Sequence, residues 1–157
     1  IPGDAEQLSF PSGQDLIVSC SALQWFVSPE LFFKRCNALL SGHGYFAFST
    51  FGKENLKEIA AVTGSGLHYY SLEELKKSLS MHYNIVTAGE ERIRLTFATP
   101  LDVLYHLKHT GVTAVCRQAW TKGDLQEFCD KYAKLFSCGN AVTLTYHPLY
   151  IIARKKP

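Results

Sequence analysis

Apolar and polar positions along this chain switch between two spacings, which predicts strands and helices in alternation. Residues 15–20 form a short, nearly continuous apolar run with β-branched side chains, typical of a parallel strand that is covered on both faces. Ser28 and Pro29 then suit the N-cap and the first position of a helix. The apolar stripe of this helix consists of Phe32, Phe33, Cys36, Leu39 and Leu40.

This first strand and helix lead into a second strand at residues 45–50, after Gly42 and Gly44 end the helix. A strand, a helix and a strand joined by short connections make up half of a doubly wound sheet. A further helix is expected from near Glu54 to Gly64. The pattern therefore predicts an α/β fold.

Three capping boxes, each a Ser or Thr followed three residues later by an acidic residue, predict the starts of later helices. The pairs are Ser71 with Glu74, Thr99 with Asp102, and Thr121 with Asp124. Gly111 should end the helix that follows Thr99. The helix after Thr121 has the most regular stripe, formed by Leu125, Phe128, Cys129, Tyr132, Leu135 and Phe136.

Two long extended segments flank the last pair of helices. Residues 84–97 alternate late in the segment, which predicts a half-exposed strand near a sheet edge. The last strand, residues 141–153, contains Pro148, so we expect it to lie at an edge or to carry a bulge there. The two helices between these strands are too apolar for a loose linker, and we expect them to form a lid over an active site.

Composition narrows the classes of function. The net charge of +2 gives no reason to expect nucleic acid as a partner. No apolar run reaches the roughly 20 residues that span a bilayer, and no signal segment opens the chain, so we expect a protein of the cytoplasm with no membrane partner. The five cysteines are scattered without a CxxC spacing, which agrees with a reducing compartment.

Neither metal chemistry nor a nucleophilic cysteine is supported by the residues. The six histidines are dispersed, and His106 with His109 lacks a matching third ligand nearby. None of the cysteines lies beside a recognisable partner or at a glycine-flanked elbow.

Three stretches of sequence carry a likeness to a known family. They are GDAEQLSF at 3–10 with DLIVSCSALQWF at 15–26, GYFAFSTFGKENLKEI at 44–59, and LDVLYHLKHTGVTA at 101–114 with Arg117 and LTYHPLYIIARK at 144–155. Their order and spacing resemble class I S-adenosylmethionine-dependent methyltransferases, most closely those that methylate malonyl-acyl-carrier protein in biotin synthesis. Thr113, where the family more often has Asn, and Pro148 depart from the family pattern.

The resemblance implies the C-terminal part of a Rossmann-like class I methyltransferase sheet, with a helical lid inserted before the last strand. Residues 1–98 would form a partial core, 99–139 the lid, and 140–157 the final strand with a basic tail. The glycine-rich cofactor loop of the family is absent before Gly3, and the first residue is Ile1, so we expect a fragment of a longer protein.

The implied reaction is methyl transfer from S-adenosylmethionine to the free carboxylate of malonyl-acyl-carrier protein, with phosphopantetheine carrying the malonyl group. A carboxylate is already ionised at neutral pH, so no catalytic base is expected. The protein must align the reactants and exclude water. A methyltransferase for another small molecule, and a truncated non-catalytic interaction domain, are the alternatives.

For the cofactor, the resemblance implies contacts from Gly3, Asp4, Ala5, Cys20 and Ser21. The Asp4 carboxylate would accept hydrogen bonds from the adenine amino group or the ribose, and Ala5 would offer backbone groups. The alternative is that Asp4 is only a turn residue. Cys20 and Ser21 end a strand, where ligands bind in open α/β sheets.

For the substrate, the candidates are Trp25, His106, Lys108, Arg117 and Tyr146. Trp25 would line the pocket, and Arg117 would bind the malonyl carboxylate through two hydrogen bonds. His106 and Lys108 are two residues apart on a helix, so at most one points into the site, and His106 is favoured. The alternative for each is a packing or solvated residue.

The expected loss of neighbouring strands has a further consequence. The strand at residues 15–20 would become an apolar sheet edge, and such an edge pairs readily with another copy. We therefore expect self-association through this edge.

Overall fold

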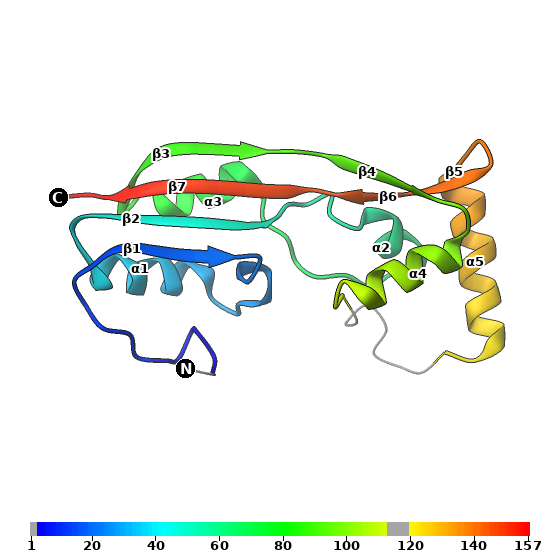
Figure 1. The fold of residues 1–157 in the computed structure, drawn as a ribbon, viewed down its shortest axis with the longest axis horizontal. Helices are drawn as coiled ribbons and strands as arrows, with labels where there is room; N and C mark the ends of the chain where they lie inside the picture. Colours follow the sequence, from blue (N-terminus) through cyan, green and yellow to red (C-terminus); the bar gives the residue numbers. More distant parts are fainter. Residues whose placement is uncertain (1–2, 113–119) are drawn as a thin grey trace. The chain divides into compact units, whose positions relative to one another are not determined.

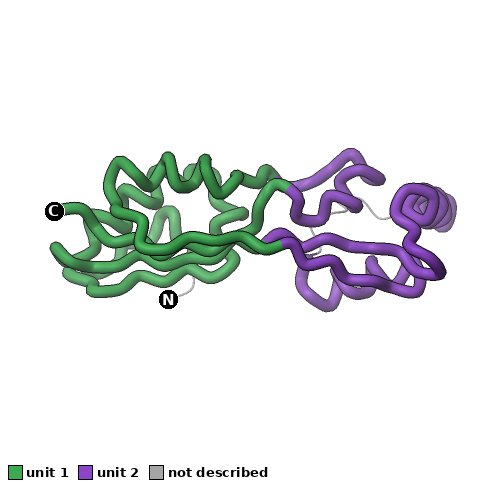
Figure 2. The backbone as a smooth tube through the Cα atoms, turned by 90° about the horizontal axis from the view of Figure 1, so that it is seen from above, with its two compact units in different colours: residues 1–53, 68–91, 148–157 green, residues 54–67, 92–147 purple. Residues whose placement is uncertain are grey.

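The computed structural model describes residues 3–112 and 120–157, which form two compact units. Unit 1 consists of residues 1–53, 68–91 and 148–157, and unit 2 of residues 54–67 and 92–147 (Figure 2). The chain therefore passes from one unit to the other four times. Each unit has its own sheet and its own hydrophobic core.

Unit 1 is built on a four-stranded sheet in the order β1-β2-β7-β3 (Figure 1). The strands are β1 (Gln14–Cys20), β2 (Leu40–Phe51), β7 (Pro148–Lys155) and β3 (Tyr83–Glu90). β1 and β2 are parallel and are joined through α1 (Pro29–Leu39), which confirms the predicted strand–helix–strand unit. β7 is antiparallel to both of its neighbours.

One face of this sheet is covered by α1 and α3 (Leu72–Leu79), and an aromatic cluster fills the space between. Phe46 is fully buried, and its ring lies 5.9 Å from the Phe33 ring and 5.0 Å from the Phe48 ring. Tyr83 closes the cluster, because its hydroxyl donates to the Phe33 carbonyl at 2.9 Å. Of the predicted stripe, Phe32, Phe33, Cys36 and Leu40 belong to this core, although Leu40 begins β2, whereas Leu39 is only half-buried and lies outside it.

The opposite face of the same sheet exposes apolar side chains. Leu16 and Val18 are 57% and 58% exposed, and Tyr45, Tyr150 and Ile152 on the neighbouring strands are also exposed. The prediction that residues 15–20 are covered on both faces was therefore wrong. Their composition suits a doubly covered strand, but the helices of unit 1 lie on the face to which Ile17 points.

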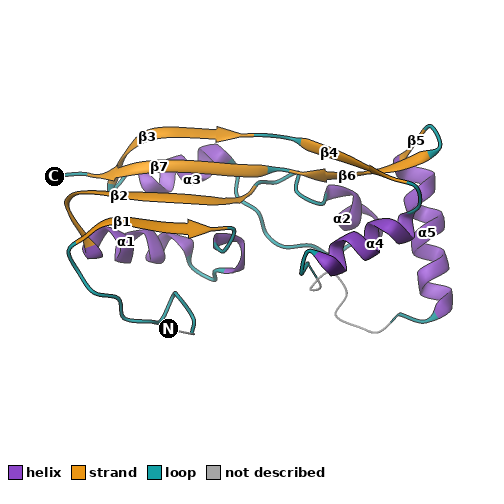
Figure 3. Cartoon of the chain, viewed as in Figure 1, coloured by secondary structure: helices purple, strands orange, loops and turns teal. Residues whose placement is uncertain are grey.

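Unit 2 has a three-stranded antiparallel sheet in the order β4-β6-β5. Its strands are β4 (Ile93–Phe97), β6 (Ala141–Tyr146) and β5 (Ser137–Cys138), and its helices are α2 (Lys57–Thr63), α4 (Pro100–His109) and α5 (Lys122–Phe136) (Figure 3). Val103, Phe128, Tyr132 and Leu144 form the centre of its core. The predicted lid boundaries at 99–139 stay a prediction; by its contacts, unit 2 also includes α2, β4 and all of β6.

All three predicted capping boxes are present with both of their hydrogen bonds, at the starts of α3, α4 and α5. Ser28 occupies the predicted N-cap of α1, but its side chain makes no capping bond. α2 begins at Lys57 rather than near Glu54, and β2 begins at Leu40, before the two glycines. On α5, Leu135 is exposed although it belongs to the predicted stripe.

Both long extended segments are broken into two strands. Residues 84–97 divide into β3 and β4, and residues 141–153 divide into β6 and β7 around His147, with each half in a different sheet. β6 and β7 are central strands, so the prediction of an edge position was wrong. Pro148 is the first residue of β7, where a missing N–H is tolerated, and the register shift lies at Ile85–Thr87 of β3 instead.

No helix in the described part of the chain combines the length and the hydrophobicity needed to cross a bilayer.

Candidate functional site

In unit 1, the loop after β1 is held against the end of β2. Ser21 has a left-handed backbone with φ of 49°, and its N–H donates to the Ser49 carbonyl at 3.0 Å. The Gln24 amide donates to the Ser21 carbonyl at 2.5 Å and accepts from the buried Thr50 hydroxyl at 3.1 Å. A left-handed serine costs backbone energy and persists only when its surroundings fix it. Gln24 is such a support, and its role was not predicted from the sequence.

Cys20 and Ser21 are exposed at the carboxyl end of β1, as the prediction requires for ligand contacts. Trp25 ends a short 3-10 helix, Leu23–Trp25, and is 50% exposed. It is therefore not a core residue, which weakens the packing alternative. Its role as a pocket wall stays a prediction.

The segment that precedes β1 forms a turn centred on Asp4. The Asp4 side chain accepts from the Glu6 N–H at 2.9 Å, and its backbone carbonyl accepts from Gln7 and Leu8. Asp4 is exposed, whereas Ala5 packs against the core of unit 1. Asp4 therefore lies in a turn, and because its side chain faces solvent, its cofactor role stays a prediction.

Glu6 was not among the predicted residues, yet it fastens this segment to α1. Its two carboxylate oxygens accept from the Val27 and Ser28 N–H groups, each at 2.8 Å. Arg35 of α1 donates in return to the Glu6 and Leu8 carbonyls. These partners lie more than 20 residues apart in sequence, so no local pattern could have revealed them.

In unit 2, the structure brings together two predicted substrate residues that are 40 residues apart in sequence. His106 of α4 and Tyr146 of β6 share a hydrogen bond of 3.0 Å between Nε2 and the hydroxyl, and both side chains are half-buried. The Phe97 ring centroid lies 5.1 Å from that of His106. Burial raises the pKa of the Tyr146 hydroxyl, and a hydrogen bond from Thr110 opposes this shift in part.

The remaining substrate candidates are not part of this pair. Lys108 is exposed, in line with the expectation that at most one of His106 and Lys108 points inward. Arg117 lies outside the described residues. A neutral tyrosine hydroxyl and an imidazole are both able to donate hydrogen bonds to a carboxylate. The His106–Tyr146 pair is therefore the best candidate for carboxylate binding among the described residues of unit 2.

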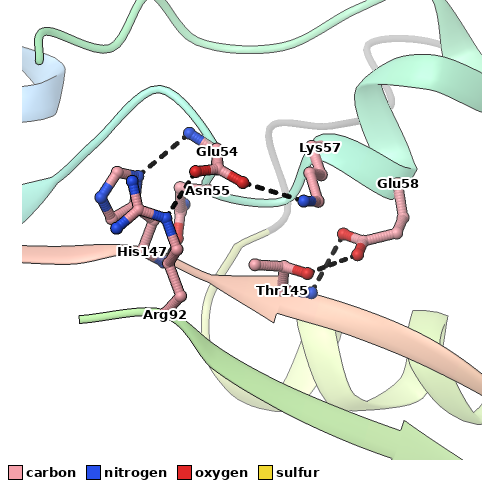
Figure 4. Close-up of polar contacts among 7 residues, drawn as sticks. All are labelled: Glu54, Asn55, Lys57, Glu58, Arg92, Thr145 and His147. Atoms are coloured by element: carbon pink, nitrogen blue, oxygen red, sulfur yellow. Dashed lines mark hydrogen bonds and ion pairs between the residues drawn. The ribbon is translucent and has the colours of Figure 1, made fainter.

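A buried polar cluster next to this pair was not predicted (Figure 4). Glu58 accepts from the Thr145 N–H at 3.0 Å and from the Thr145 hydroxyl at 2.5 Å. The Asn55 side chain accepts from the His147 N–H at 3.2 Å. A sequence signal existed only as Thr145 and His147, which interrupt the otherwise largely apolar segment 144–153.

At the edge of this cluster, Glu54 forms hydrogen bonds with three other residues. Its carboxylate accepts from Arg92 at 2.5 Å and from Lys57 at 2.9 Å, and its N–H donates to His147 Nδ1 at 3.2 Å. The hydrogen bond from Arg92, and then that from Lys57, lower the pKa of Glu54 to about 2. Among the described residues, no group of three His, Cys, Asp or Glu side chains is placed to hold a metal ion.

Comparison with known proteins shows which proteins this chain resembles. A family model described as "Methyltransferase domain" matches residues 1–48. The chain is 56% identical, over 99% of its length, to a malonyl-[acyl-carrier protein] O-methyltransferase from Bacteroides thetaiotaomicron, and covers 64% of that protein. It is 55% identical to the protein of the same name from Bacteroides helcogenes, of which it covers 58%. Over nearly its whole length, the chain is therefore similar to methyltransferases of this name. It spans about three fifths of the length of these relatives.

Solved structures agree on the fold. A Bacillus halodurans protein, provisionally classed as a methyltransferase, has a TM-score of 0.65 at 16% identity, with 99% of this chain and 70% of that protein covered. Phosphoethanolamine N-methyltransferase 2 from Haemonchus contortus, solved with S-adenosylhomocysteine, has a TM-score of 0.52 at 14% identity, with 98% of this chain and 36% of that protein covered. The chain therefore has the mixed α/β fold of class I methyltransferases, as predicted.

Proposed function

We propose that this chain is part of an enzyme that transfers a methyl group from S-adenosylmethionine to the free carboxylate of malonyl-acyl-carrier protein, in biotin synthesis in the cytoplasm. The observation that carries the proposal is the identity of 56% over nearly the whole chain to a protein of that name. Free cysteines among the described residues are compatible with a reducing compartment.

The residues of unit 1 suit the cofactor in part. Asp4 presents an exposed carboxylate, which accepts hydrogen bonds of the kind that an adenine amino group or ribose hydroxyls donate. Cys20 and Ser21 lie at the open carboxyl end of a parallel strand, the usual place for a ligand in such sheets. Together with Gly3 and Ala5, these residues would hold S-adenosylmethionine, which supplies an activated methyl group when bound.

The residues of unit 2 would bind and orient the other reactant. The malonyl carboxylate is ionised at neutral pH, so the protein needs donors that orient it rather than a base that removes a proton. The His106–Tyr146 pair would provide one such donor, because the other proton of the neutral pair is used in the bond between the two groups. Lys108 and Arg117 would be further contacts, and Trp25 of unit 1 stays a separate candidate for a pocket wall. Too many strong donors would weaken the carboxylate as a nucleophile, so one or two neutral donors suit the reaction better than several cations.

The test uses the longer protein and this chain side by side. Isothermal titration with S-adenosylhomocysteine should give micromolar binding to the longer protein, reduced about tenfold by Asp4→Ala because one charged hydrogen-bond acceptor is lost. The rate of methylation of malonyl-acyl-carrier protein should likewise be higher for the longer protein than for its Asp4→Ala variant. Absence of methyl transfer by the longer protein, despite cofactor binding, would refute the malonyl substrate and leave another small molecule as the acceptor.

We also propose that the chain of 157 residues self-associates through the β1 edge of its sheet. Exposed Leu16 and Val18 on this edge strand support the proposal, because an unpaired apolar edge favours pairing with another copy. Light scattering should show a dimer or larger assembly, and Val18→Lys should return it to a monomer. A monomer at high concentration without any substitution would refute this proposal.

A further inference from the structure

A short segment from a distant part of the sequence forms hydrogen bonds with the end of β6. We call residues 54–58 the clasp. Within it, Glu58 accepts from the Thr145 N–H at 3.0 Å, the Leu56 N–H donates to the Thr145 carbonyl at 2.8 Å, and Asn55 accepts from the His147 N–H at 3.2 Å. The five residues of the clasp thus form three hydrogen bonds with the backbone at the end of β6. Figure 4 shows the side chains of Asn55 and Glu58 that take part.

The polar side chains of the clasp that form these hydrogen bonds, and those of their partners, are buried. Asn55, Glu58, Thr145 and His147 are each no more than 5% exposed. Buried polar groups that lose their partners are costly, so each of these bonds strongly favours one arrangement of the strand end. Leu56 takes a left-handed backbone with φ of 54°, a conformation that persists only where neighbouring contacts impose it.

Tyr146 lies between the two clasped residues. Side chains alternate along a strand, so Thr145 points to one face of β6 and Tyr146 to the other, and His147 follows directly after the strand. On that other face, the Tyr146 hydroxyl lies 3.0 Å from His106 Nε2. The clasp therefore fixes the backbone on both sides of the tyrosine without touching the hydroxyl that meets the histidine.

We propose that Asn55 and Glu58 are positioning residues, which hold the Tyr146 hydroxyl against His106 and so preorganise this pair for binding the carboxylate of the substrate. The inference rests on the proposed function for its biological meaning. Its physical content, the dependence of the His106–Tyr146 bond on the clasp, stands apart from that function. One proton of the neutral pair lies in the bond between the two groups, so the other donates to the carboxylate, and it does so well only when both groups are held close to the required geometry.

Each substitution that removes a hydrogen bond of the clasp is paired with one at the same position that keeps it. Thr145→Val removes the hydroxyl that Glu58 binds, and Thr145→Ser keeps it. Asn55→Ala removes the acceptor of the His147 N–H, and Asn55→Asp keeps it. Thr143→Val is the matched control, because Thr143 is buried two residues away on the same strand and face but has no bond to the clasp.

The first readout is nuclear magnetic resonance of the imidazole nitrogens of His106 in this chain. Tyr146→Phe defines the signal of a His106 that has lost its partner. We expect Thr145→Val and Asn55→Ala to move the His106 signal towards that value, and the restoring variants and Thr143→Val to leave it unchanged. Circular dichroism confirms that each variant is folded, and if Thr145→Val unfolds, the Asn55 pair decides.

The second readout is the kinetics of the longer protein with malonyl-acyl-carrier protein. We expect the disrupting variants to raise KM about tenfold with little change in kcat, because they weaken the binding of a ground-state carboxylate. Wild-type His106 signals in both folded disrupting variants would overturn the positioning role. If the signals move but Tyr146→Phe leaves KM unchanged, the positioning role stands and the proposed substrate site is wrong.

Discussion

The two units bury different kinds of side chain. The core of unit 1 is aromatic and aliphatic, and Thr50 is its one buried polar residue among those described. Unit 2 buries five polar or charged residues, namely Asn55, Glu58, Thr143, Thr145 and His147. Apolar packing is nearly non-directional, whereas a buried hydrogen bond requires a specific distance and angle. Burial of apolar surface therefore dominates in unit 1, whereas buried hydrogen bonds in unit 2 fix the orientation of particular groups.

The largest effect is expected from the centre of the aromatic core of unit 1. Phe46→Ala should lower the free energy of unfolding by about 3–5 kcal/mol, because it removes a fully buried ring and leaves a cavity. Urea denaturation followed by circular dichroism measures this loss. Leu31→Ala is the control, since Leu31 on α1 is 63% exposed and should cost far less. A loss below about 1 kcal/mol for Phe46→Ala would mean that the aromatic cluster does not organise this unit.

The matching substitution in unit 2 is polar. Glu58→Ala should cost about 3 kcal/mol, because the Thr145 N–H and hydroxyl lose their acceptor in a buried place. Glu58→Gln should cost much less, since the amide oxygen can accept from the N–H while the amide nitrogen donates to the hydroxyl. Glu127→Ala removes an exposed pair with Lys131 and should change stability by less than about 0.5 kcal/mol. Equal losses for the Ala and Gln variants would contradict the directional role of Glu58.

Alkaline pH should act on unit 1 through Cys36. Burial raises the pKa of this thiol from 9.0 to about 12, opposed in part by the Arg35 charge. Because the folded pKa lies above the unfolded one, the stabilisation is complete below pH 9 and is lost as the pH rises from 9 towards 12. At pH 10 the loss should be about 1.4 kcal/mol. Urea midpoints at pH 7 and pH 10 should show a smaller decrease for Cys36→Ala than for the wild type, and identical decreases would refute this assignment.

The smallest effect compares one hydroxyl in each unit. Tyr83 in unit 1 donates to the Phe33 carbonyl at 2.9 Å, and Tyr132 in unit 2 donates to the Thr143 carbonyl at 2.7 Å. Substitution of either tyrosine by Phe should cost about 1 kcal/mol, since each removes one buried hydrogen bond and little volume. Equilibrium denaturation of both variants measures these two losses of stability. If only the Tyr132 variant is destabilised, hydrogen bonds in the apolar unit contribute nothing measurable.

Local signals in the sequence were sufficient wherever the structure depends on neighbours in the chain. Each capping box joins residues three positions apart, and all three lie at the predicted helix starts. Among the candidate residues, Cys20 was correctly predicted to end the first strand, with Ser21 directly after it. The meeting of His106 with Tyr146 joins two residues that were predicted separately, each from the family resemblance.

Contacts between distant segments escaped prediction. Pro148 was interpreted as a sign of a sheet edge, because the sequence shows the missing N–H but not the sheet to which each half of the segment belongs. Glu6, Gln24 and Glu58 are polar residues whose partners lie elsewhere in the chain or in a loop geometry that composition does not reveal. Nothing in their local sequence distinguishes them from solvated residues.

The sequence by itself determined the α/β class, the three helix starts with capping boxes, most of the apolar stripes and the resemblance to methyltransferases, because each of these depends on residue types at short spacings or on their order along the chain. Only the tertiary structure decided that two long strands divide between two sheets, and that one face of the four-stranded sheet in unit 1 exposes Leu16 and Val18. It also decided that residues 54–58 grip the strand that carries Tyr146. The physical reason is that burial and hydrogen-bond pairing between distant segments depend on which surfaces meet, and a linear pattern does not contain that information.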